Sequence, residues 1–152
     1  MRLRATVEET PVDVDHEAQA LADVVTLLKP LRELRKHAAQ RHQRQAQQVA
    51  EAMQASLAQA QLACAEDLDL QRQQRRALAA QCEGQVMSLN GIQQWHQEEQ
   101  RLMDRQAQLR SHVQRLQLDL EAQRQRVAQA QLQVRASQRA LEKLACLSET
   151  LG

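Results

Sequence analysis

The sequence predicts an all-α protein, a long antiparallel two-helix coiled-coil hairpin. The first observation is composition: good helix formers such as Ala, Gln, Leu, Arg and Glu dominate, while Trp95 is the sole aromatic residue among 152. The large side chains that fill a thick globular core are therefore missing. The second is an apolar heptad repeat sustained over the last 60 or so residues. The third is a single glycine-containing break between two uninterrupted helical tracts.

The chain opens with residues 1–10, which show no period and read as a loose lead-in. The run Thr10-Pro11-Val12-Asp13 then resembles a helix start, with a threonine cap, proline at the first helical position and an acidic residue three after the cap. The β-branched Val12 and Val14 disfavour this start, and Asp15 is the alternative cap.

Pro30 follows an apolar cluster at residues 21–28. Proline inside a helix costs about 3 kcal/mol and usually kinks or ends it. Either a short extra N-terminal helix precedes a long helix that starts near Pro30, or one helix bends there. The expected organisation is an N-terminal extension at 1–29 and a hairpin at 30–152. The segment up to about Val24 has no facing residues in the second arm. That segment must protrude, dock elsewhere or bind a partner.

The first arm, residues 31–83, contains no helix breaker but carries a weak seam. Taking position a from Val25 and position d from Leu28 gives mostly small or polar residues at the later positions: Ala39, His42, Ala46, Val49, Met53, Ser56, Ala60, Ala63, Leu70 and Ala77. A parallel apolar set drifts around the helix, namely Met53, Leu57, Ala60, Cys64, Leu68 and Leu78. We therefore expect the apolar stripe to rotate or shift register midway.

The second arm has the clearest heptad of the chain. Every seventh residue from Ile92 gives the a series, which is Ile92, Glu99, Gln106, Val113, Leu120, Val127, Val134, Leu141 and Ser148. Every seventh from Trp95 gives the d series, which is Trp95, Leu102, Leu109, Leu116, Gln123, Ala130, Ser137, Leu144 and Leu151. This spacing keeps one seam facing a partner helix.

The break GQVMSLNG at 84–91 predicts the turn of the hairpin. If Glu83 faces Ile92, the numbers of opposed residues sum to roughly 175, given equal rise along both helices. This pairing keeps the three cysteines too far apart for a disulfide. Unpaired cysteines suit a reducing compartment. It also gathers basic residues of both arms at the open end of the hairpin: Arg32, Arg35, Lys36, Arg41, Arg44, Arg135, Arg139 and Lys143. Such residues either solvate the outer faces of the helices or steer an acidic partner to them.

Signals of enzymatic chemistry are missing, so we expect no catalytic residue, cofactor or metal site. The sequence has no glycine-rich phosphate loop, GxSxG or HExxH motif. His37 and His42 are five apart and point to different faces of a helix. The carboxylates of Glu66, Asp67 and Asp69 are expected to be solvated. A net charge of +1, with no aromatic beside the arginines, argues against nucleic acid, and no signal peptide or membrane span is predicted.

Trp95 has two interpretations. It can plug the hairpin tip together with Ile92 and Val86, as aromatics usually pack. It can instead be a hot spot for a docking partner. Glu99 and Gln106 at a positions make the nearby seam polar, so it is easier to open or to share with a third element.

The run Met87-Ser88-Leu89-Asn90-Gly91-Ile92-Gln93-Gln94-Trp95 resembles the short Leu-Asn element and early aromatic of the YscO/FliJ family of type III secretion systems, on the YscO side. The resemblance extends through the heptads to about Leu147 and, more loosely, back through residues 27–35. This chain departs from the family in its N-terminal extension and in lacking a long hydrophilic C-terminal tail.

The resemblance implies a non-enzymatic stalk or escort protein, cytoplasmic and peripheral to the inner membrane. Family members bind a hexameric export ATPase through the end holding both termini, and contact the export gate and chaperones of secreted substrates. Trp95 matches the aromatic of the gate-facing tip, with Ile92 and Leu102 beside it, and the chain is expected to be monomeric in isolation. The alternative is a generic structural coiled-coil scaffold or dimerisation module.

Overall fold

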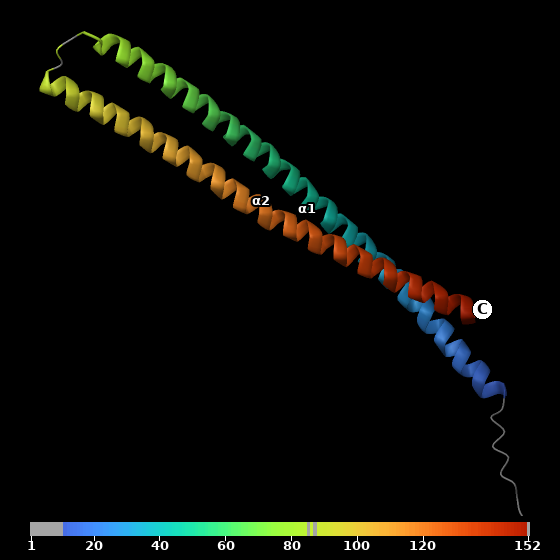
Figure 1. The fold of residues 1–152 in the computed structure, drawn as a ribbon. Coiled ribbons are helices and arrows are strands. Elements are labelled where there is room, and N and C mark those ends of the chain that lie inside the picture. Colours follow the sequence, from blue (N-terminus) through green and yellow to red (C-terminus); the bar gives the residue numbers. More distant parts are fainter. Residues whose placement is uncertain (1–10, 85, 87, 152) are drawn as a thin grey trace, which may run out of the picture. The chain divides into compact units, whose positions relative to one another are not determined.

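The structure, a computed structural model, describes residues 11–84, 86 and 88–151, with side chains from Val14 onward. It contains two helices, α1 (Pro11–Cys82) and α2 (Leu89–Leu151), and no strand among the described residues. The two helices pack against each other as a helical hairpin (Figure 1), which confirms the predicted fold class. The expected lead-in at 1–10 lies outside the described residues.

α1 begins at Pro11, the first of the two predicted starting points, and continues through Pro30. One continuous helix therefore replaces the short extra N-terminal helix, and residue 29 is not a boundary between helices. The missing N–H of Pro30 leaves the carbonyl of Thr26 without its usual helical donor. Both residues are exposed, so water can hydrate that carbonyl and the helix tolerates the proline.

The turn is shorter than the predicted 84–91. α1 ends at Cys82, and Gly84 follows with a φ of 83°, a left-handed conformation that favours glycine. α2 starts at Leu89 because Ser88 caps it: the Gly91 N–H donates to Ser88 Oγ at 3.2 Å, and the Ile92 N–H donates to the Ser88 carbonyl at 3.1 Å. Leu89, Asn90 and Gly91 are therefore helical.

The chain divides into two compact units, each made from one part of α1 and one part of α2. The turn unit is Gln47–Gln125, and the terminal unit is Met1–Ala46 with Arg126–Gly152. Contacts between helices occur at Gln71–Leu102 and Gln54–Arg124 in the turn unit, and at Arg32–Ala140 in the terminal unit. The residue numbers of each pair add to nearly the expected sum, so the predicted antiparallel pairing is confirmed in both units.

The seam of α2 follows the predicted heptad. The buried residues of this helix all belong to the predicted a and d series: Gln106, Leu120, Gln123, Val127, Ala130, Val134 and Leu144. Most of them lie in the second half of the helix, whereas Ile92 and Trp95 near the turn are exposed. The apolar core is therefore concentrated away from the turn.

The seam of α1 differs from the prediction. The series from Val25 is correct, since Ala46 and Asp67 are buried on it, but the series from Leu28 is wrong, since Val49 and Leu70 are exposed. The second series lies four residues after the a positions and is buried or half-buried from Lys36 to Leu78: Lys36, Gln43, Ala50, Leu57, Cys64, Gln71 and Leu78. The seam keeps one register and does not shift midway. Because several residues of the second series are polar, the apolar pattern of the sequence does not reveal this continuous register.

Candidate functional site

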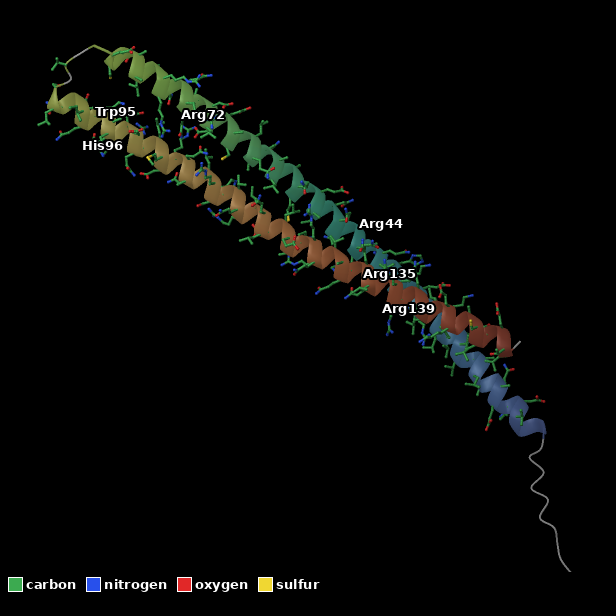
Figure 2. All side chains as sticks on the ribbon, viewed as in Figure 1. Arg44, Arg72, Trp95, His96, Arg135 and Arg139 are labelled. Carbon is green, nitrogen blue, oxygen red and sulfur yellow. The ribbon has the colours of Figure 1, made fainter. Side chains whose placement is uncertain are left out.

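The terminal unit carries the predicted basic surface, which we define as Arg32, Arg35, Lys36, Arg135, Arg139 and Lys143. A hollow of about 290 Å³ lies between the helices here, lined by Arg32, Arg35, Ala136, Ser137 and Ala140. Figure 2 shows Arg135 and Arg139 on α2. Basic side chains of α1 are therefore brought against α2, as the pairing predicts.

The six basic side chains do not have equal access to a partner. Arg32 is half-buried and donates from Nη1 to the Ala140 carbonyl at 2.7 Å, so it tethers α1 to α2. Lys36 is half-buried on the seam of α1, where its aliphatic stem can cover apolar surface. The remaining four are exposed, namely Arg35, Arg135, Arg139 and Lys143. These four can meet an acidic partner, a distinction that the sequence pattern does not make.

The turn unit holds an apolar groove of about 340 Å³ beside the turn. Its floor and walls are Leu78, Ala79 and Cys82 from α1 with Ile92 and Trp95 from α2. The exposed fractions of Trp95 and Ile92 are 40% and 49%, so much of their apolar surface meets solvent. We call this the tip groove.

Two further residues predicted at the tip lie elsewhere. Val86 is fully exposed, so it does not plug the tip with Trp95 and Ile92, and that prediction is wrong. Leu102 is half-buried on the seam and does not line the tip groove; its carbonyl accepts a hydrogen bond from Gln71. An ion pair between Arg75 and Glu99, 3.7 Å from nitrogen to oxygen, lies at the edge of the groove.

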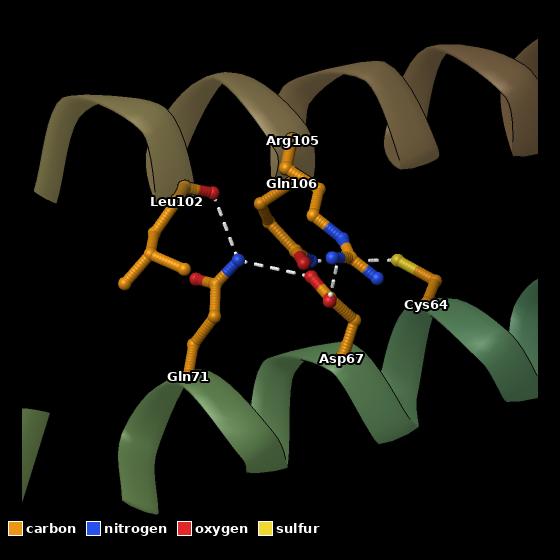
Figure 3. A network of polar contacts seen from close by, with 6 residues as sticks. All are labelled: Cys64, Asp67, Gln71, Leu102, Arg105 and Gln106. Carbon is orange, nitrogen blue, oxygen red and sulfur yellow. Dashed lines mark hydrogen bonds and ion pairs between the residues drawn. The ribbon is translucent and has the colours of Figure 1, made fainter. Parts of the chain in front are cut away.

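A polar layer crosses the seam of the turn unit (Figure 3). Asp67 is 7% exposed. Its carboxylate accepts a hydrogen bond from Gln71 Nε2 at 2.9 Å and forms an ion pair with Arg105 Nε at 3.0 Å. Gln71 Nε2 also donates to the Leu102 carbonyl at 2.8 Å, which joins the two helices. The prediction that Asp67 is solvated is wrong, because the seam carries it against α2.

Gln106 and Cys64 extend the polar layer. Gln106 Nε2 donates to Cys64 Sγ at 3.4 Å, while its Oε1 is buried with no hydrogen-bond partner. An unsatisfied buried acceptor costs about 1–3 kcal/mol. The polar seam expected below Trp95 is therefore present, and it weakens the packing there. Continuing the Val25 heptad through polar positions identifies Asp67, and the series four residues after it identifies Gln71.

The metal-ligating side chains of the described residues are dispersed along the helices. Within the described ranges, no group of three or more His, Cys, Asp or Glu residues can hold a metal ion. His37 and His42 are both exposed on α1. Cys64, Cys82 and Cys146 are free thiols. Neither described helix has a stretch that is apolar and long enough to cross a lipid bilayer.

Comparison with known proteins gives no relative from which a role could be transferred. No protein-family model matches the chain, and neither the curated proteins nor the solved structures contain a significant match.

Proposed function

We propose that this chain is a non-enzymatic stalk or escort component of a type III protein secretion apparatus. In this role it binds the export ATPase and the export gate or substrate chaperones, at the cytoplasmic side of the inner membrane. The resemblance of residues 87–95 to the YscO/FliJ family motivates the proposal. The observation that carries it is the convergence of exposed basic side chains from both helices on the terminal unit, including Arg35, Arg135 and Arg139.

The two surfaces have different chemistry, which suits two different partners. The basic surface attracts acidic groups on an ATPase ring, because complementary charge accelerates encounter and fixes orientation. The tip groove is apolar, and it can receive an apolar side chain of a gate protein or chaperone. In the proposed role the two binding events are coupled through α1 and α2, each of which contributes residues to both surfaces.

Charge reversal on the basic surface is expected to abolish the effect of this chain on the export ATPase. The wild-type chain should raise ATP hydrolysis and ring assembly when added to the purified ATPase. The double variant Arg135→Glu/Arg139→Glu should lose at least about tenfold in binding, because several favourable charge pairs become repulsive. Steady-state ATPase rates and co-sedimentation measure both effects.

The matched control is Arg110→Glu/Arg115→Glu, which changes the same charge at two exposed positions of α2 in the turn unit. It should stimulate the ATPase like the wild type. Equal loss in both double variants would indicate non-specific attraction, and no stimulation by the wild type would remove the ATPase from the proposal.

Trp95→Ala is expected to reduce secretion in cells more than it reduces stability. Trp95 is 40% exposed, so truncation removes limited packing but most of the apolar surface offered to a partner. Secretion assays and thermal unfolding should be compared with Met103→Ala, which truncates another exposed apolar side chain of α2 outside the tip groove. A large loss of melting temperature with normal secretion would assign Trp95 to packing alone.

The alternative, a structural coiled-coil scaffold or dimerisation module, is favoured by the large apolar side chains that α1 exposes before residue 35, such as Leu27 and Leu34. A scaffold of this kind would leave ATPase rates unchanged and would be insensitive to charge reversal at Arg135 and Arg139.

A further inference from the structure

The first part of α1 exposes a row of large apolar side chains that α2 does not cover. Leu21, Val24 and Leu31 have exposed fractions of 53%, 48% and 52%. They lie about a quarter turn around α1 from the seam that faces α2, at roughly 100° per residue. This row is a second apolar face, adjacent to the one that closes the hairpin.

The second face has regular heptad spacing. Its successive positions alternate between four and three residues apart: Glu17, Leu21, Val24, Leu28, Leu31 and Arg35. This is the a and d spacing of a coiled-coil seam. The apolar positions are bracketed by one carboxylate and one guanidinium, and both of these end residues are exposed. We call these six residues the outer seam.

The outer seam is complementary to the outer seam of a second copy that runs antiparallel to it. When a second copy is laid antiparallel with the two-fold axis at Thr26, Glu17 faces Arg35, Leu21 faces Leu31 and Val24 faces Leu28 of the other copy. Each layer then joins an a position to a d position, as antiparallel pairing requires, and both charges meet an opposite charge. Parallel pairing would instead set Glu17 against Glu17 and Arg35 against Arg35.

We propose that two copies of this chain associate antiparallel through the outer seam. The charge pattern favours an antiparallel second copy as the partner. Like-charge contacts disfavour a parallel copy, while two Glu17–Arg35 pairs stabilise the antiparallel one. Leu27 and Leu34 flank the outer seam and widen its apolar area. The outer seam takes no part in closing the hairpin, so this association depends on concentration and leaves each hairpin intact.

Charge exchange tests the proposal. Sedimentation equilibrium of the full chain over a concentration series should show a monomer–dimer equilibrium for the wild type. Glu17→Arg and Arg35→Glu should each raise the dimer dissociation constant by about tenfold or more, because each creates two repulsive contacts. An equimolar mixture of the two variants, and the double variant Glu17→Arg/Arg35→Glu, should each restore association to near the wild-type level.

The matched control is Glu33→Arg, the same change at an exposed position on the opposite side of α1. It should dimerise like the wild type, and circular dichroism should show equal helicity in all variants. A wild type that stays monomeric at every concentration, or single variants that weaken association without rescue by exchange, would overturn the proposal. So would equal weakening by Glu33→Arg.

Orientation is measured with a spin label at the exposed position of His37, after replacement of the three cysteines by alanine. In the antiparallel dimer the two labelled positions are separated by roughly 30 Å along the helix axes, from the rise per residue. Labels within about 20 Å of each other would match a parallel pair and contradict the proposal.

Discussion

Leu120→Ala is expected to lower the free energy of unfolding by about 2–4 kcal/mol. Leu120 is 3% exposed and lies at an a position in the best packed part of the turn unit. Its truncation removes apolar burial and leaves a cavity in the seam, where the antiparallel pairing places the buried Leu57 of α1 opposite. The hairpin has no third element that could collapse into the space among its described residues.

Urea unfolding followed by circular dichroism measures this loss, and Leu118→Ala is its matched control. Leu118 is two residues away on the same helix, with 71% of its surface exposed. Both changes have the same effect on helix propensity, so the difference between them isolates packing. Leu118→Ala should stay within about 0.5 kcal/mol of wild type. Similar losses in both variants would mean that Leu120 is not part of a packed seam.

Gln71→Ala is expected to destabilise the protein by about 1–3 kcal/mol. The side-chain amide donates to both Asp67 and the Leu102 carbonyl. Its removal leaves the buried Asp67 carboxylate with Arg105 as its remaining partner, and the Arg105 side chain is 66% exposed, so water screens that pair. A buried carboxylate that loses a donor costs more than a neutral group that does so.

The measurement is again urea unfolding, with Gln73→Ala as the control because Gln73 is exposed on the same helix. Gln71→Asn provides a second comparison, because it keeps the amide but shortens its reach to Leu102. Gln71→Ala should be the least stable of the three variants. Stability equal to that of Gln73→Ala would show that the polar layer contributes nothing.

The sequence predicts the antiparallel hairpin and the seam of α2, because Leu120, Val127 and Val134 are apolar and spaced at a positions. For the α1 seam it predicts the series from Val25 but not the second series, and it does not show that Asp67 and Gln71 are buried. Apolar pattern alone cannot show that a carboxylate is buried, since its burial depends on donors that the other helix supplies, here Arg105. α2 starts earlier than predicted. Glycine and asparagine usually indicate a turn, but the Ser88 cap allows both among the first helical residues.

The candidate surfaces are predicted in part. Antiparallel pairing brings Arg35 and Arg139 onto one unit, which follows from residue numbers alone. The tether from Arg32 to Ala140 does not, because it depends on where one long side chain bends. The proximity of Trp95 and Ile92 follows from their helical spacing, whereas the apolar character of Val86 does not predict its complete exposure.

The uneven distribution of apolar burial in the turn unit has a consequence for folding kinetics. Bringing Cys82 and Ile92 together at the tip groove closes a short loop, whereas bringing Leu57 opposite Leu120 closes a much longer one. The extra closure entropy is only about 1.5 kcal/mol. Burial of Leu120 offsets a cost of that size. An early contact of the half-exposed Trp95 and Ile92 buries less apolar surface and therefore stabilises less. We therefore expect the rate-limiting nucleus to form at Leu57 and Leu120, and the turn region to order afterwards.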